Sequence, residues 1–194
     1  MANNFRYGFK SESEFYASAF REELSLAPHA PLHAKALAEH LEIPVRPLST
    51  HDGVPEDIKK FWLTNGEDTF SGVTINDGTY KEIVHNDFHH PRRQNSDIAH
   101  ELAHILLGHP LTAPIKANGE RDYIPAIEEE AKWLGATLLL PKKALIYIIL
   151  NGLTIETVQD EYGVSASLFR FRVQVTDAYR AAKNTRRKYG TAAE

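Results

Sequence analysis

Residues 96–110 read SDIAHELAHILLGHP, and this stretch decides how the rest of the chain is interpreted. It carries His100 and His104 four residues apart, with Glu101 directly after the first. Residues four apart lie on one face of an α-helix, with Cβ atoms about 5–6 Å apart, so two imidazoles can bind one metal ion. Glu101 can then reach a water on that ion, where a general base is needed. We therefore predict His100 and His104 as metal ligands and Glu101 as the catalytic base.

The residues around the two histidines are typical of a core helix. Ile98, Leu102 and Ile105 form an apolar stripe beside the histidine face, and Ser96 is a residue type that often caps a helix N-terminus. We expect a helix from Ser96 to about His109. The alternative is a core helix in which both histidines are structural and hold no metal.

A hydrolytic zinc site usually has three protein ligands and one open position. His109 lies five residues beyond His104, about 140° around the same helix, so it is expected at the surface or as a neighbour of a ligand rather than as a ligand. The metzincin pattern requires Gly and His at two later positions, which here hold Leu107 and Pro110. The third ligand must therefore come from another part of the chain.

A later predicted helix, IEEEAKWLGATLLLP, offers three consecutive glutamates. Its apolar stripe faces the core, and Glu128 and Glu130 flank that stripe on opposite sides, while Glu129 is less favourably placed. For any one of them, the alternative role is to stabilise the helix N-terminus by its charge. Helix periodicity alone leaves the choice open.

Composition narrows the cellular setting. The chain has 194 residues, 42% hydrophobic and 25% charged, which is ordinary for a globular domain. It has no cysteine, so any zinc must be held by nitrogen and oxygen. The start, MANNFRYGFKSESEF, lacks the pattern of a secretory signal, and no apolar run approaches about 18 residues. We expect a cytoplasmic protein with no membrane partner.

Periodicity predicts helices at both ends of the chain and a small sheet between them. Helical patterns occupy residues 11–26, 31–42 and 55–63 before the sheet, and about 125–140, 142–150 and 154 onward after the histidine helix. The segments FSGVTIND and TYKEIVHN flank Asp77-Gly78, a dipeptide favoured in tight hairpin turns. This order indicates an α+β fold.

The C-terminal part is basic although the whole chain has a net charge of −4. From residue 165 onward, seven Lys and Arg residues stand against Asp177 and Glu194. The segment TIETVQDEYGVSASLFRFRV also has a Gly-Val-Ser turn between two helical runs, as in a helix-turn-helix, although Gln159 stands where a small residue usually packs. A solvated basic helix, a surface for an acidic partner and a DNA-binding surface remain open.

Longer stretches carry a family resemblance. RQNSDIAHELAHILLGH followed by EEEAKWLGATLLLP resembles the ImmA/IrrE family of zinc metallo-endopeptidases, with Lys132 in place of the family's usual Asn. FREELSLAPHAPLHAKALAEHLEIPV and YGVSASLFRFRV are similar to the family's N-terminal and C-terminal segments. By this resemblance, Glu130 of the Glu130-Ala131 pair is the third ligand beside His100 and His104.

The resemblance also implies an architecture and an activity. It implies one gluzincin-like metallopeptidase domain over residues 1–194, mostly helical with a small antiparallel sheet. Its parts would be N-terminal helices and a first strand (about 1–50), a catalytic core (51–150) and C-terminal helices with a basic tail (151–194). The activity would be zinc-dependent endopeptidase cleavage of a partner such as a helix-turn-helix repressor or an antitoxin, in a stress, mobile-element or toxin–antitoxin system. The alternative is a DNA-binding or repressor-sequestering protein without proteolysis.

A peptidase also needs a donor for the oxyanion and a surface that binds the peptide. The donor that stabilises the oxyanion could be Tyr123, Tyr147, His90 or Arg92, and the sequence does not choose among them. In related zincins an edge strand pairs with the peptide substrate, and TYKEIVHN is the candidate for such β-addition.

Overall fold

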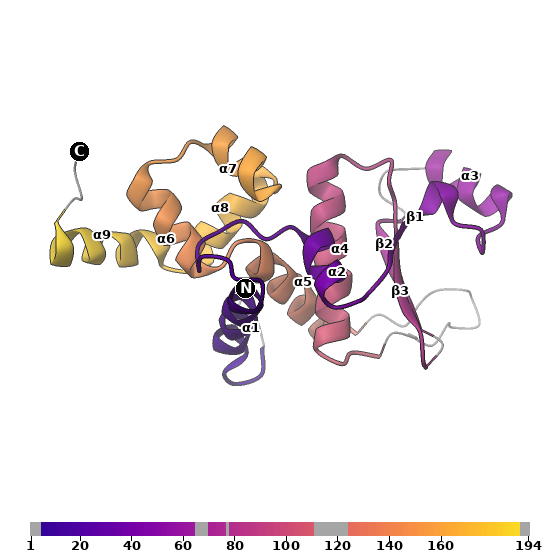
Figure 1. Ribbon diagram of the computed structural model, residues 1–194, viewed down its shortest axis with the longest axis horizontal. Helices are drawn as coiled ribbons and strands as arrows, with labels where there is room; N and C mark the ends of the chain where they lie inside the picture. Colours follow the sequence, from indigo (N-terminus) through magenta and orange to yellow (C-terminus); the bar gives the residue numbers. More distant parts are fainter. Residues whose placement is uncertain (1–4, 65–69, 77, 111–123, 191–194) are drawn as a thin grey trace.

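A small sheet and a bundle of helices lie on opposite sides of one long helix (Figure 1). The computed structural model describes residues 5–64, 70–76, 78–110 and 124–190. Its helices are α1 (Phe9–Glu23), α2 (Ala34–His40), α3 (Glu56–Thr64), α4 (Pro91–Leu106), α5 (Pro125–Leu139), α6 (Lys142–Asn151), α7 (Ile155–Tyr162), α8 (Ala166–Val175) and α9 (Ala178–Tyr189). Its strands are β1 (Val45–Pro47), β2 (Gly72–Asn76) and β3 (Lys81–His85), with a 3₁₀ turn at Leu48–Thr50. The predicted α+β class is confirmed.

The strand order in the sheet is β1-β3-β2. β2 and β3 form the predicted antiparallel hairpin, although Asp77 of its expected turn lies outside the described residues. β1 pairs in parallel with β3, so the sheet is mixed rather than purely antiparallel. The prediction that TYKEIVHN forms an edge strand is therefore wrong. Ile83 and Val84 of β3 are 0% and 2% exposed, and consecutive buried residues are typical of a central strand.

The central helix α4 begins five residues earlier than predicted. His90 is its N-cap, with Nδ1 accepting a hydrogen bond from the backbone N–H of Arg92 at 3.2 Å. Pro91 occupies the first turn, where its missing N–H costs nothing and its fixed φ suits a helix. Ser96 is not the cap, because it lies within the helix and its hydroxyl donates to the carbonyl of Arg92. The signal for this start in the sequence is Pro91 itself, five residues before Ser96.

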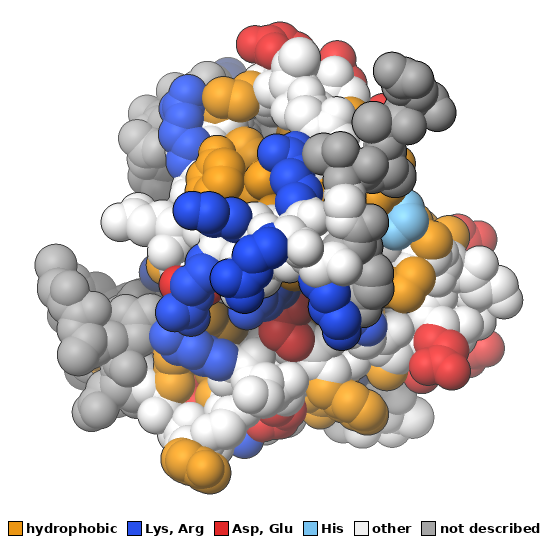
Figure 2. Space-filling model, turned by 90° about the vertical axis from the view of Figure 1, so that its left-hand side faces the viewer, with side chains coloured by type: hydrophobic (Ala, Val, Ile, Leu, Met, Phe, Trp, Pro, Cys, Tyr) orange, Lys and Arg blue, Asp and Glu red, His pale blue; other side chains and the backbone are white. Residues whose placement is uncertain are grey.

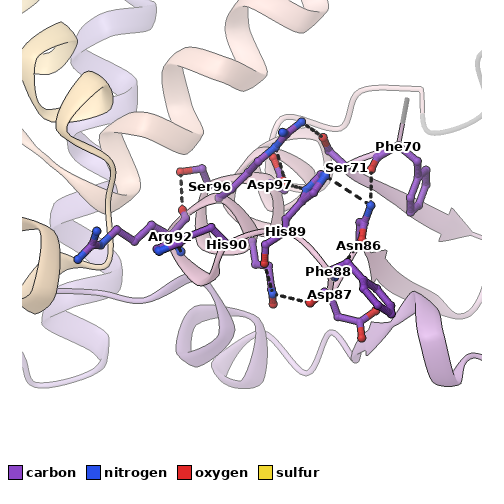
Figure 3. A network of polar contacts seen from close by, with 12 residues as sticks. Phe70, Ser71, Asn86, Asp87, Phe88, His89, His90, Arg92, Ser96 and Asp97 are labelled. Carbon is purple, nitrogen blue, oxygen red and sulfur yellow. Dashed lines mark hydrogen bonds and ion pairs between the residues drawn. The ribbon is translucent and has the colours of Figure 1, made fainter. Parts of the chain in front are cut away.

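A buried histidine ties the first turns of α4 to the sheet (Figure 3). His89 Nδ1 lies 3.0 Å from Asp97 Oδ2, and its Nε2 lies 3.4 Å from the amide nitrogen of Asn86. The same amide donates to the carbonyl of Phe70 at 3.1 Å. If Asn86 donates to Nε2, the proton of His89 is on Nδ1 and is donated to Asp97. This chain of contacts fixes the position of α4 against the β2–β3 hairpin.

Two fully buried arginines hold the corner between α5 and α6 against α1. Arg21 donates from Nη2 to the carbonyl of Leu138, and Arg172 donates from Nε to the carbonyl of Leu140, both at 3.0 Å. Arg172 also pairs with Glu14 at 2.9 Å, and Glu14 in turn accepts from the first backbone N–H of α6, that of Lys142. Burial lowers the pKa of Arg21 to about 10, which leaves it charged at neutral pH.

The C-terminal helices present much of the predicted basic surface. Figure 2 shows Lys and Arg side chains gathered on the face formed by this end of the molecule. Arg172 is an exception, since it is 0% exposed and belongs to the core. Arg186 donates to the carbonyls of Ile149 and Leu150 and so caps the end of α6. The exposed members are Arg170, Arg180, Lys183, Arg186, Arg187 and Lys188.

No single helix in the described ranges is long and apolar enough to cross a membrane. α5 and α6 reach the required length and composition only as a pair bent by 44°, and most residues in the second half of α5 are buried within the fold.

We predict that replacing Arg172 by Met destabilises the fold by about 3 kcal/mol, because Glu14 and the carbonyl of Leu140 lose their buried partner. Arg170→Met on the same helix is the matched control, since Arg170 is exposed and should change the free energy of unfolding by no more than about 0.5 kcal/mol. Urea unfolding followed by circular dichroism measures both. Equal effects of the two substitutions would contradict the role assigned to Arg172.

Candidate metal centre

Three side chains from α4 and α5 converge on one point. His100 Nε2 and His104 Nε2 lie 3.1 Å apart. The Glu128 carboxylate faces this pair, with Oε2 3.2 Å from His100 Nε2 and Oε1 3.5 Å from His104 Nε2. Hydrogen bonds from the two imidazoles hold the pKa of Glu128 far below its usual range. All three ligand atoms therefore face one another, in an arrangement that can hold a metal ion.

This convergence depends on an unusually close approach of α5 to α4. Gly135 lies against the α4 backbone, and a Cβ atom at this position would be 2.9 Å from the carbonyl oxygen of Ala99 and 3.1 Å from the backbone nitrogen of His100. Ala131 and Ala103 add small, fully buried side chains, one on each helix. Small residues let two backbones approach, and the ligands on both helices come within reach of one ion as a result.

The row of small residues on α5 also explains why Glu128 reaches the histidines. Glu128, Ala131 and Gly135 are spaced three and four residues apart, so they share one helix face. Ala131 and Gly135 are buried on that face, and Gly135 packs on α4. Helix periodicity leaves both Glu128 and Glu130 open, and the small residues on the face of Glu128 are the signal in the sequence that distinguishes them.

Glu130, the third ligand expected from the resemblance, lies elsewhere. Its carboxylate is 3.5 Å from His109 Nε2 and 3.5 Å from Arg6 Nε. His109 in turn places its Nδ1 3.0 Å from Nδ1 of His104. Burial and the neighbouring His104 lower the pKa of His109, against the opposing effect of Glu130. The structure thus brings Glu128 to the Nε2 side of the histidines and Glu130 to the opposite, Nδ1 side of His104.

Glu101 points from α4 toward strand β2. The hydroxyl of Thr74 donates a hydrogen bond of 2.7 Å to Glu101 Oε2. Gly72 lies beside the same side chain, and a Cβ atom there would be in ordinary contact, 3.4 Å from Glu101 Cγ. The sequence does not identify either residue of β2, since their relevance depends on how the sheet packs on α4. The hydrogen bond from Thr74 fixes the Glu101 carboxylate on the β2 side of α4.

Three of the four oxyanion candidates make their contacts with other residues. Arg92 is eight residues before His100, about 12 Å along the helix, and it pairs with Asp160 at 2.7 Å. His90 is still further along as the N-cap. Tyr147 stacks on His29, with ring centroids 3.8 Å apart. The fourth candidate, Tyr123, lies outside the described residues.

Comparison with known proteins agrees with the histidine helix. The profile of Peptidase_M78, described as the IrrE N-terminal-like domain, matches residues 38–174. The chain belongs to this family. Membership of Peptidase_M78 confirms the family resemblance of the sequence. The matched region includes both histidines, Glu101 and the three glutamates of α5.

Other comparisons add less to the Peptidase_M78 assignment. No curated protein matches the chain significantly. Among solved structures, a Mycobacterium tuberculosis transcriptional regulator is similar, with 14% sequence identity and a TM-score of 0.48. The match covers 89% of this chain and 48% of that one, so this chain spans about half the length of the regulator.

We predict that Gly135→Ala disrupts the metal centre. The added methyl group forces α5 away from α4, so we expect zinc affinity to fall at least about 10-fold, and stability to fall by about 1–3 kcal/mol from overpacking. Helix propensity alone would make the alanine variant more stable than the wild type by about 1 kcal/mol. A loss of stability therefore indicates a clash between α5 and α4. Chelator competition and urea unfolding measure the two effects.

Glu129→Ala, at an exposed position of the same helix, is the control and should retain zinc affinity. A Gly135→Ala variant that gains stability and retains zinc would show that the close helix contact does not shape the site.

Proposed function

We propose that the chain is a zinc-dependent endopeptidase whose metal is held by His100, His104 and Glu128. The donor triangle carries this proposal. Tetrahedral zinc with bonds of about 2.0–2.1 Å separates its ligand atoms by about 3.3 Å. The two imidazole Nε2 atoms lie 3.1 Å apart, and each has one oxygen of the Glu128 carboxylate nearby, Oε2 at 3.2 Å from His100 and Oε1 at 3.5 Å from His104. Two imidazoles and a carboxylate are also the donor set of hydrolytic zinc sites, and nitrogen and oxygen are the only choices in a chain without cysteine.

The partial exposure of the cluster supports catalysis rather than a purely structural role. The side chains of His100 and Glu128 are 24% and 25% exposed, so solvent and substrate can reach one side of the triangle. Catalytic zinc sites keep such an open position, whereas structural sites are closed. When bound, zinc supplies Lewis acidity, which polarises a carbonyl group and makes water a stronger acid.

The protein's own groups account for proton transfer. Glu101 takes a proton from the attacking water and delivers it to the leaving amine. Its Oε2 is held by the hydroxyl of Thr74, which orients the carboxylate. A carboxylate that accepts a hydrogen bond from Thr74 is held in one rotamer before substrate arrives, and this positioning lowers the entropic cost of the reaction.

A peptide substrate can add to the sheet at β2. Within the described residues β2 is an edge strand, and it carries the two residues that contact Glu101, Thr74 and Gly72. A peptide that pairs with this edge would pass the base and the ligand triangle. We propose a protein substrate in the cytoplasm, with a helix-turn-helix repressor or an antitoxin as the expected class from the family resemblance.

The DNA-binding alternative receives less support. The predicted helix–turn–helix is present as α7 and α8, with Gly163 in the turn and Ser165 capping α8. However, α7 exposes Glu156, Asp160 and Glu161, which would repel phosphates. α7 is also tied to α4 through the ion pair of Asp160 with Arg92.

Paired glutamine substitutions distinguish the two candidate ligands on α5. Loss of a residue that only supports a metal ligand typically weakens metal binding by roughly 10–100-fold. We predict a loss within this range for Glu130→Gln and a larger loss for Glu128→Gln. The two changes are chemically identical and two residues apart, so each controls for the other. Zinc affinity is measured by competition with a chelator. A larger loss from Glu130→Gln would restore Glu130 as the ligand.

The catalytic role of Glu101 has its own test. Zinc-loaded protein is incubated with a random-sequence peptide library, and new peptide ends are identified by mass spectrometry. We predict that Glu101→Gln still binds one zinc per chain but cleaves about 100-fold more slowly or worse, because the general base is lost.

Cleavage by Glu101→Gln at the wild-type rate would contradict this assignment. If the zinc-loaded wild type cleaves no peptide, the sequestering alternative is favoured instead. A Lys142→Gln variant, altered on α6 outside the ligand triangle, serves as the control for handling and purity.

A further inference from the structure

The end of α4 brings His109 back onto a proposed zinc ligand. The last residue of α4 is Leu106, and Leu107 is its C-cap. Gly108 follows with φ at +64°, the left-handed conformation that favours glycine. The backbone N–H of His109 bonds to the carbonyl of His104 at 3.0 Å, and that of Gly108 bonds to the carbonyl of Ile105 at 3.2 Å. This pair of bonds is a Schellman motif, which folds the chain back over the last turn of a helix.

This turn corrects the geometry expected from the sequence. On a continuous helix, His109 would lie about 140° away from His104. Because the helix ends before Gly108, the imidazole of His109 instead packs against that of His104, with ring centroids 5.1 Å apart. The His109 side chain is 8% exposed and that of Glu130 is 16% exposed, so the contacts are sheltered from water.

The nitrogen positions define one consistent set of protons. When a metal ion occupies the position that Nε2 of His104 faces, the proton of this ring is on Nδ1. That Nδ1–H lies 3.0 Å from Nδ1 of His109, which must then accept. The remaining proton of His109 is on Nε2, 3.5 Å from a carboxylate oxygen of Glu130. His104 thus donates to His109, and His109 donates to the negatively charged carboxylate of Glu130.

We propose that His109 and Glu130 are positioning residues that orient His104 and strengthen it as a zinc ligand. The proposal rests on the proposed function, since it takes His104 Nε2 as a ligand atom. Donation from Nδ1–H fixes the ring plane and raises the basicity of Nε2, which strengthens the metal bond. Arg6 contacts the other oxygen of Glu130 at 3.5 Å and extends the support to the segment before α1.

The support is specific to one of the two histidines. Nδ1 of His100 is buried and has no hydrogen-bond partner among the described residues. At His100 the close contact is to the backbone, whose nitrogen lies against Gly135 of α5. Among the described residues, the support through Nδ1 is therefore found at His104 and not at His100.

Zinc affinity tests this role without relying on catalysis. Chelator competition should show 10–100-fold weaker zinc binding by His109→Ala. His109→Gln should lose less, because its amide oxygen can accept from His104 and its amide nitrogen can donate to Glu130. His40→Ala is the control, because His40 also pairs with a glutamate, Glu23 at 2.8 Å, but lies on α2.

A pair of glycine variants tests the turn itself. Gly108 and Gly152 both follow a helix, with φ of +64° and +62°, and a Cβ atom would meet nothing within 4 Å at either position. Alanine therefore introduces the same backbone strain in both. Gly108→Ala should weaken zinc binding and Gly152→Ala should not. Equal zinc affinities for these two variants, together with wild-type affinity in His109→Ala, would overturn the proposal.

A spectroscopic measurement makes the test independent of folding in the variants. In ¹⁵N-labelled, zinc-loaded wild-type protein, a scalar coupling between Nδ1 of His104 and Nδ1 of His109 is expected across the hydrogen bond. Its absence would overturn the proposal even if zinc binds. If zinc binds but Glu128→Gln has no effect on affinity, the proposed ligand set fails instead, and this result is distinct from a failure at His109.

Discussion

The close contact between α4 and α5 is the constraint on which the rest of the structure depends. Without a side chain at Gly135, the α5 backbone can lie directly on the carbonyl of Ala99 and the nitrogen of His100. This distance sets where Glu128 lies relative to the two histidines. The sheet packs on another side of α4 (Figure 1). The helix therefore carries ligands toward α5 and the base toward β2.

Other parts of the fold hold these two helices in place. The buried His89–Asp97 contact fixes the start of α4 against the hairpin, and the turn at Gly108 fixes its end. Arg21 and Arg172 fix the far end of α5 by binding its last carbonyls. A site that needs ligand atoms within a few tenths of an ångström therefore rests on contacts at both ends of each helix. Of the basic residues in the C-terminal helices, Arg172 contributes to this scaffold because it is fully buried.

Local patterns in the sequence predicted much of this architecture. The HELAH spacing correctly placed His100 and His104 on one helix face, and turn residues correctly located the hairpin. The predicted helix start at Ser96 is wrong because His90 caps the helix and Pro91 occupies its first turn. The edge strand was misassigned because β1 pairs with β3 over a long sequence separation that no local pattern reveals. The position of Glu128 depends on a close helix contact, whose sequence signal is only the small residues Ala131 and Gly135.

The most direct test of the central claim is anomalous scattering at the zinc edge from a crystal of the zinc-loaded protein. The account predicts one strong peak between α4 and α5, bonded to His100 Nε2, His104 Nε2 and a carboxylate oxygen of Glu128. A peak bonded to Glu130, or two imidazoles that point to different places with no shared peak, would contradict it.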